Sequence, residues 1–465
     1  MSEFLEFVLM KLQSGLVLVL LALMVAAAVV GMIHWLHKRR FKGERQFPWR
    51  RTLLWLLLLG YLVLVLYATL LRWHGGYREW NLHLFRAWRE AWNNFSAKSW
   101  ANVLLNIAMF VPLGFLLPMM GRKFRRWYVT IPAGIGASAL IELAQLLLNR
   151  GICDVDDLFC NGLGAMMGYF AGMAVLAAFN EKGKRLRPVL RYGALALMPV
   201  FVIGGIFGAY HFREYGNLPE AAAYRIDLDH LDWKLECSLP EVSGAVPVYR
   251  TQPMSKADCD AFATEMAVLT GQEVQMVSYY QEMAYYNLSR DIMMVYYHDG
   301  SFEFGWFDYD RPRGHEADRQ TVEKALLPYS VTVPEAAVFR QEEDGSYSFT
   351  CDEYHDGEAM LDGTLQVQLG ADGEICWIRN GLISYTHHAD APIKTAQEAY
   401  ELLKDGEFYY AEALKRHSGD SVTVISCELD YEIDTKGFYQ PVYRFEILIP
   451  ETGDICHAMI GAMTT

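Results

Sequence analysis

Polar and ionisable side chains stand within or beside long apolar runs between residues 106 and 168. The candidates for chemistry are Asn106, Glu142, Gln145, Arg150, Asp154, Asp156, Asp157 and Asn161. Such groups are costly at membrane depth, so by default they mark a functional site. An acid beside an arginine, together with several carboxamides, is suited to binding a polar group.

Three interpretations of these residues stay open at the level of the sequence. In the first, they close on one another: Glu142 bonds to Asn106 or Arg150, and Asp157 caps a helix, where aspartate is favoured. In the second, they line a pocket for a polar head group, such as that of a lipid-linked wall precursor. In the third, the aspartates of residues 154–157 hold a divalent cation, because hard cations take carboxylate oxygens. That loop lacks the glycine and downstream glutamate of a calcium loop, so we assign no metal and no cofactor.

Six apolar segments position these residues, and each is long enough to cross a bilayer at about 20 residues per crossing. They cover residues 15–35, 52–71, 103–120, 128–148, 158–180 and 190–210. The first segment has a competing interpretation as a cleaved signal peptide, because the alanines at 26–28 resemble a cleavage site. Only Lys11 supplies the basic region that a signal peptide needs, so we favour a membrane helix.

Charge divides the chain into two parts. Residues 1–209 hold 23 Lys and Arg against 10 Asp and Glu, a net charge of +13. The rest of the chain holds 18 Lys and Arg against 45 Asp and Glu, a net charge of −27. Mean hydropathy is only +0.08 because it averages an apolar, basic part and an acidic part. The acidic part argues against binding to nucleic acid and suits a soluble domain.

Basic loops predict the orientation in the membrane. The loops around residues 38–51, 122–126 and 182–187 fall on the same side if all six spans are real, and the positive-inside rule makes that side cytoplasmic. The Trp-rich loop at 72–101, the acidic loop and everything after Tyr210 would then lie outside. The polar candidates would gather within roughly 10 Å of depth under the outer surface.

Small residues in the third and fifth spans predict close helix packing. Gly164, Gly168 and Gly172 form a small-xxx-small stripe that lets a neighbouring helix approach. Pro112 and Gly114 are expected to open the backbone of the third span, with neighbouring groups satisfying what is freed.

The spaced polar and small residues resemble one family, the VanZ-like membrane proteins, over about residues 53–179. The resemblance is carried by Asn106, Phe110, Pro112, Gly114, Glu142, Gln145, Arg150, Asp156, Asp157, Asn161, Gly164 and Gly168. It implies a multi-pass protein of the bacterial cell membrane with a role in the cell envelope. Family members are associated with low-level resistance to the glycopeptide teicoplanin, and no enzymatic activity is established for the family at large.

Residues 214–465 show alternating runs, Asp-Gly turns and short helices, which predicts an extracytoplasmic α+β domain of two modules, 214–330 and 331–465. We expect helices at 255–270, 319–327 and 395–404, and a hairpin at His298-Asp299-Gly300. Further turns are predicted at Asp344-Gly345, Asp362-Gly363 and Asp372-Gly373. The end of the chain resembles YycH/YycI or PepSY-type extracytoplasmic modules, which implies protein–protein contacts.

Catalytic signatures are not found. No G-x-S-x-G, Walker or H-E-x-x-H motif occurs, and no pair of cysteines has C-x-x-C spacing. The eight cysteines leave their pairing undetermined. We therefore assign no catalytic residue, and an enzyme that uses Glu142 or an aspartate as general base on a lipid-linked substrate is the least favoured alternative.

The sequence predicts a bundle of about six transmembrane helices, residues 1–210, followed by an extracytoplasmic α+β domain. The favoured function is a non-enzymatic envelope protein whose outward polar pocket meets membrane lipid, a lipid-linked wall precursor or a glycopeptide, contributing to teicoplanin resistance. The alternative is a membrane-anchored regulator whose acidic domain modulates a sensor kinase or a wall enzyme.

Overall fold

The computed structural model describes residues 29–32, 34–35, 39, 48–71, 78–149, 151–179, 186–218, 228–242, 244–280, 282–306, 317–329, 331–356, 359–370, 372–406, 408, 414 and 421–464. The chain divides into two compact units, Met1–Glu214 and Tyr215–Thr465. Arg150 and most of the predicted first span, residues 15–35, lie outside the described residues.

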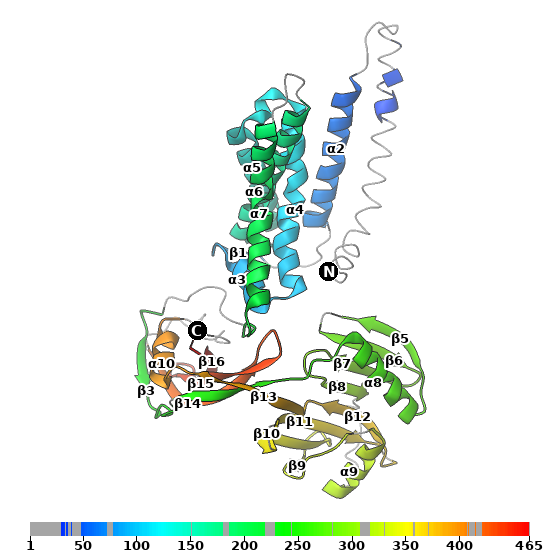
Figure 1. Cartoon of the computed structure of the whole chain (residues 1–465), viewed down its shortest axis with the longest axis vertical. Coiled ribbons are helices and arrows are strands. Elements are labelled where there is room, and N and C mark those ends of the chain that lie inside the picture. Colours follow the sequence, from blue (N-terminus) through cyan, green and yellow to red (C-terminus); the bar gives the residue numbers. More distant parts are fainter. Residues whose placement is uncertain are drawn as a thin grey trace. The chain divides into compact units, whose positions relative to one another are not determined.

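Among the described residues, five helices of the first unit are long and apolar enough to cross a membrane (Figure 1). They are α2 (Trp49–Leu66, continued by a π-helical segment, Tyr67–Leu71), α4 (Ala97–Met120), α5 (Trp127–Leu148), α6 (Val155–Ala178) and α7 (Leu186–Phe212). They correspond to the predicted second to sixth spans. Helix α4 begins ahead of the predicted residue 103 because the Ser96 hydroxyl caps it, accepting from the Ser99 N–H at 3.1 Å.

Short elements connect these helices. They are β1 (Arg78–Asn81), α3 (Arg86–Asn94), a 3-10 turn (Arg122–Arg125) and β2 (Gly151–Asp154). β1 and β2 pair in parallel, with Asn81 opposite Asp154. This pairing joins the Trp-rich loop to the acidic loop.

Helices α4 and α6 approach each other at their backbones. A Cβ added to Gly164 or Gly168 would overlap a backbone carbonyl oxygen of α4, that of Ile107 or Val111. Glycine is therefore the residue that permits this contact, as in other membrane helix pairs. Gly114 on α4 meets Ala165 of α6 in the same way, and a Cβ on Gly172 would lie 2.9 Å from the Phe115 carbonyl oxygen.

Pro112 lies inside α4, and the helix continues past it to Met120. The expected opening of the backbone at this point does not interrupt the helix.

The second unit contains one mixed sheet and three helices within the described residues. Its strands are β3 (Asp232–Leu235), β4 (Ala245–Arg250), β5 (Val274–Tyr279), β6 (Met283–Leu288), β7 (Ile292–Tyr296), β8 (Phe302–Gly305), β9 (Val338–Gln341), β10 (Tyr347–Asp356), β11 (Ala359–Leu369), β12 (Ile375–Asn380), β13 (Ile383–Pro392), β14 (Ser421–Ile433), β15 (Phe438–Ile449) and β16 (Asp454–Gly461). Its helices are α8 (Lys256–Leu269), α9 (Arg319–Leu326) and α10 (Ala396–Lys404). A helical bundle followed by an α+β domain confirms the predicted fold class.

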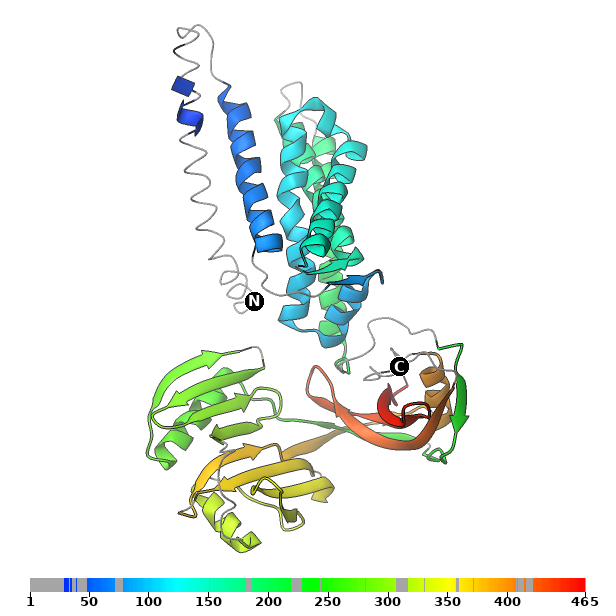
Figure 2. The ribbon, with the colours of Figure 1, turned by 180° about the vertical axis from the view of Figure 1, so that it is seen from behind.

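The path through the sheet runs β3-β14-β15-β4-β13-β11-β12-β8-β7-β6-β5, with β16 beside β15 and with β10 between β11 and β9. Figure 2 shows α10 with β14–β16 at one end of this sheet and α8 with β5–β8 at the other. β4 and β13 link the two ends, because β4 pairs with both β13 and β15.

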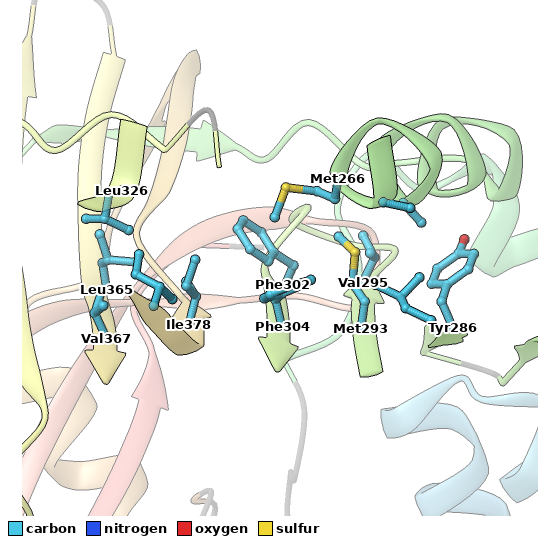
Figure 3. Close-up of a cluster of buried hydrophobic side chains, with 14 of the residues drawn as sticks. Met266, Tyr286, Met293, Val295, Phe302, Phe304, Leu326, Leu365, Val367 and Ile378 are labelled. Atoms are coloured by element: carbon cyan, nitrogen blue, oxygen red, sulfur yellow. The ribbon is translucent and has the colours of Figure 1, made fainter. Parts of the chain in front are cut away.

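Two large apolar clusters, and several smaller ones, fill the described part of this unit. The larger one joins α8 and α9 to β6–β12, and Figure 3 shows its side chains, with Met266 and Leu326 meeting the strand residues Phe302 and Leu365. The other packs α10 against β14–β16, through Leu403, Tyr443 and other buried residues. Both clusters take residues from either side of position 330, and the division into modules at that position stays a prediction.

Local signals in this unit are largely confirmed. Ser255 with Asp258, and Thr395 with Glu398, form capping boxes at the starts of α8 and α10. The predicted hairpin joins β7 to β8, with Gly300 at φ +72°.

One predicted turn is wrong. Asp362-Gly363 lies inside β11, not between strands. Gly363 nevertheless has φ +110°, and a Cβ there would overlap the Gly381 carbonyl oxygen. The Asp-Gly pair therefore marks a close backbone approach within the sheet.

Candidate functional site

The predicted polar residues meet where β2 joins the end of α5 to the start of α6. We call Asn81, Asn106, Glu142, Gln145, Asp154, Asp156, Asp157 and Asn161 the polar cluster. All of these residues except Asn81 were predicted from the sequence. Arg150, the predicted cationic member, lies outside the described residues.

Asp154 ties the loop to its surroundings. Its carboxylate accepts from the Asn81 amide nitrogen at 3.0 and 3.1 Å, and from the Asp156 N–H at 2.8 Å. The last bond makes Asp154 the N-cap of α6. The expectation that Asp157 caps this helix is wrong, because the chain enters the helix three residues earlier than predicted.

Asp156 holds α3 in place. Its side chain is completely buried, and it accepts from the backbone N–H groups of Phe85 at 2.5 Å and Ala87 at 2.6 Å. These are unpaired donors at the start of α3, which has no side-chain cap of its own. A carboxylate is favoured at that position by the helix dipole. Asp156 therefore has a structural role.

Asp157 and Asn106 connect α6 to α4. Asp157 accepts a hydrogen bond from the Asn106 amide nitrogen, and both residues are half-buried. This bond uses one of the acceptor positions of the Asp157 carboxylate, which has about four.

Glu142 is only 3% exposed and lies on α5. Its carboxylate accepts from the Asp154 N–H at 3.1 Å. The closed-network interpretation pairs Glu142 with Asn106 or Arg150; Asn106 donates to Asp157 instead, and Arg150 lies outside the described residues. Within the described part of the chain, none of the four carboxylates of the polar cluster forms an ion pair.

Two carboxamides leave an oxygen without a partner. The Asn161 amide nitrogen donates to the Ser138 hydroxyl at 2.8 Å, and that of Gln145 donates to the Thr69 carbonyl at 3.1 Å. The amide oxygens of both residues are buried and accept no hydrogen bond from any described residue. A buried polar atom left unsatisfied costs about 1–3 kcal/mol, so these oxygens call for a partner.

Two residues of this site were missed by sequence reasoning. Asn81 lies in the Trp-rich loop and reaches Asp154 only through the pairing of β1 with β2. Ser138 stands one helical turn before Glu142 on the same face of α5, and that spacing is the signal that could have found it.

Part of the first unit matches a known protein family. Residues 56–177 match the family model described as VanZ/LLP1. The first unit contains a VanZ-like domain. The match confirms the resemblance seen in the sequence and supports a membrane protein of the VanZ type. It includes every member of the polar cluster, Asn81 among them.

Among solved structures, a match to the Bacillus megaterium YpeB C-terminal domain covers 46% of this chain and 95% of that domain at 13% identity, with a TM-score of 0.20. A similarity at this level carries no argument about function. No curated protein matches the chain.

Cysteine chemistry is disfavoured at Cys153. Burial raises the pKa of the Cys153 thiol on β2, and the nearby charges of Glu142, Asp154 and Asp157 raise it further. A thiol rather than a thiolate is a poor nucleophile and metal ligand. Within the described residues, no three His, Cys, Asp or Glu side chains are arranged to hold a metal ion.

A separate cavity of about 310 Å³ lies in the second unit. It is lined by apolar and neutral polar residues: Met254, Phe262, Gly300, Phe302, Tyr329, Val331, Thr332, Pro334, Leu361, Asn380, Leu382 and Ser384. Its volume is at the lower end of the range of small-molecule sites. The absence of charge among these lining residues suits a neutral, largely apolar group.

Proposed function

We propose that this protein is a non-enzymatic envelope protein of bacteria. In this proposal the polar cluster binds the polar part of an envelope lipid or of a glycopeptide antibiotic, and so contributes to resistance to teicoplanin. In this proposal the polar cluster and the second unit lie on the outer side of the membrane, which is the orientation that the positive-inside rule favours for the basic loops.

The observation that carries the proposal is the unused binding capacity of a buried group. Glu142 is 3% exposed and, among the described residues, accepts one hydrogen bond, from Asp154. A closed network would satisfy its carboxylate and both carboxamide oxygens from within, whereas the Gln145 and Asn161 oxygens have no partner. This favours a ligand site over a purely structural network.

The test is teicoplanin susceptibility of a susceptible bacterial host that expresses the full-length chain or its Glu142→Gln variant. Glutamine keeps the shape and still accepts from the Asp154 N–H, so the variant should reach the membrane at normal levels. We expect it to lose the resistance that the parent chain confers. Resistance that persists in Glu142→Gln would refute the proposal.

Glu90→Gln is the matched control. Glu90 is an exposed acid on α3, next to the cluster but outside it. It should keep full resistance, and immunoblots of membrane fractions should show equal amounts of all three proteins.

The cavity of the second unit favours a second candidate function, that of a regulator. Its neutral lining suits an apolar side chain of a partner protein, such as a sensor kinase or a wall enzyme. Ser384→Trp would fill the cavity from β13, and Thr386→Trp, two residues along the same strand and not part of the lining, is the control. Crosslinking in cells should lose partners only with Ser384→Trp; equal recovery from both variants would exclude this role for the cavity.

A further inference from the structure

Acceptors exceed donors in the polar cluster. The amide nitrogens of Asn81 and Asn106 are both used, on Asp154 and Asp157. Within the part of the chain that the structure describes, Glu142 and Asp157 accept one hydrogen bond each, although a carboxylate has about four acceptor positions. Whatever completes this site must therefore bring donors or positive charge.

Asn161 and its partner Ser138 lie one helical turn from the two carboxylates whose acceptor positions are only partly used. Asn161 stands one helical turn after Asp157 on α6, and its amide nitrogen donates at 2.8 Å to Ser138, one turn before Glu142 on α5. The residue is 3% exposed, and its amide oxygen has no partner. A buried acceptor without a donor thus stands on the same facing surfaces of α5 and α6 as Glu142 and Asp157.

The orientation of Gln145 is set by its partner. The Thr69 carbonyl only accepts hydrogen bonds, so the amide nitrogen must face it, and the oxygen is the atom left over. Gln145 stands three residues after Glu142, on the same face of α5. The Gln145 oxygen is therefore a free acceptor, and it adds to the Asn161 oxygen, which also has no partner among the described residues.

We propose that the ligand presents a primary ammonium group to Glu142, Asp157 and the free carboxamide oxygens. This inference rests on the proposed function and names the chemistry of its ligand. An ammonium brings three donors and one positive charge to a site whose unused acceptors lie on two carboxylates and two amides. A phosphate would bring acceptors and negative charge toward carboxylates, and like charges at a binding site are strongly disfavoured.

Isothermal titration calorimetry on the full-length chain in detergent tests the chemistry. The probes are short-chain phosphatidylethanolamine, phosphatidylcholine, phosphatidylglycerol, ethanolamine and MgCl2. Phosphatidylcholine has the same net charge as phosphatidylethanolamine, but its headgroup nitrogen carries no N–H. We expect phosphatidylethanolamine to bind at least about tenfold tighter than phosphatidylcholine or phosphatidylglycerol, since three charge-assisted hydrogen bonds are lost with each. Equal binding of these lipids, or tighter binding of magnesium, would overturn the proposal.

Ethanolamine and the lipid distinguish the two sources of an ammonium. Tight binding of ethanolamine that competes with the lipid identifies a free amine as sufficient. Binding of phosphatidylethanolamine alone identifies a lipid headgroup. Either result supports the proposal, and failure of both overturns it.

Variants locate the binding. Glu142→Gln and Asp157→Asn keep an oxygen for the Asp154 N–H and the Asn106 amide, so the fold should be preserved, and circular dichroism checks this. Each variant should lower the affinity for phosphatidylethanolamine at least about tenfold, whereas Glu90→Gln should leave that affinity unchanged. Unchanged affinity in both cluster variants would place the ligand elsewhere and overturn the proposal.

The two proposals fail differently. Resistance that depends on Glu142, together with equal binding of all lipids, removes the ammonium inference and leaves the proposed function. Ammonium binding that depends on Glu142, in a host whose teicoplanin susceptibility never changes, keeps the inference and removes the role in resistance.

Discussion

Each unit of this protein buries a carboxylate, and the two differ in how fully they are hydrogen-bonded. Asp434 in the second unit is 4% exposed and Glu142 in the first is 3% exposed. Asp434 accepts four hydrogen bonds of 2.5–3.0 Å, from the backbone N–H groups of Gly216, Lys436 and Phe438 and from the Gln440 amide nitrogen. Glu142 accepts one.

This difference separates structure from function among buried acids. The four bonds of Asp434 order the turn between β14 and β15 and tie it to Gly216, so the cost of burying the charge is met within the fold. Glu142 is equally buried, but most of its hydrogen-bond acceptor positions are unused by the described residues. A count of accepted hydrogen bonds is thus more informative than burial alone.

The largest loss of local stability is expected for a substitution of Asp434. In Asp434→Asn one carboxylate oxygen becomes an NH₂ group that faces two N–H donors, whichever way the amide turns. We expect the β14–β15 turn to lose about 3 kcal/mol of protection in hydrogen exchange. Glu142→Gln is the matched control and should destabilise α5 much less, because glutamine keeps an oxygen for the one N–H donor, that of Asp154. A comparable loss in both variants would break the distinction between the two acids.

Asp156 extends the comparison to the first unit. Asp156→Asn replaces one of the two acceptors that hold the Phe85 and Ala87 N–H groups, so α3 should lose about 2 kcal/mol of protection in hydrogen exchange. Glu90→Gln on the exposed face of α3 should have no effect. If α3 stays protected in Asp156→Asn, the carboxylate is not its anchor and belongs with Glu142.

The next prediction concerns the close packing of α4 against α6. In Gly164→Ala the new methyl group meets the Ile107 carbonyl oxygen of α4, so the helices must move apart. We expect a loss of about 2 kcal/mol in unfolding by sodium dodecyl sulfate. Gly136→Ala on α5, where no atom lies within 4 Å of the added Cβ, is the control and should be neutral. Equal stability of both variants would show that α4 and α6 do not pack this closely.

The smallest effect concerns an exposed acid. Hydrogen bonds from the Thr395 N–H and hydroxyl lower the pKa of Glu398, whose ordinary value is 4.5. A carboxyl with a lowered pKa in the folded state stabilises above pH 4.5, and that contribution is lost as the pH falls through the folded pKa. Thermal unfolding should therefore show a slightly smaller loss of stability on acidification for Glu398→Gln than for the parent chain. Identical pH profiles would remove the capping box as a contributor.

Sequence reasoning found most of the polar cluster because an acid or amide in an apolar run is visible one residue at a time. It did not find the role of each aspartate. Asp154, Asp156 and Asp157 look alike in the sequence, yet one caps α6, one anchors α3 and one contacts α4. The role of each aspartate depends on the residue at which α6 begins. If the helix began one residue earlier or later, all three side chains would point in different directions.

The sequence by itself determined that a basic, apolar helical part precedes an acidic α+β part, since hydropathy, charge and capping residues act locally. It also determined the starts of α8 and α10, where both partners of each capping box lie within four residues of each other. Only the tertiary structure decided which polar groups are satisfied. Asn81 meets Asp154 and Gly216 meets Asp434 across long stretches of chain, and hydrogen bonds made at such separations depend on how the elements pack rather than on local pattern.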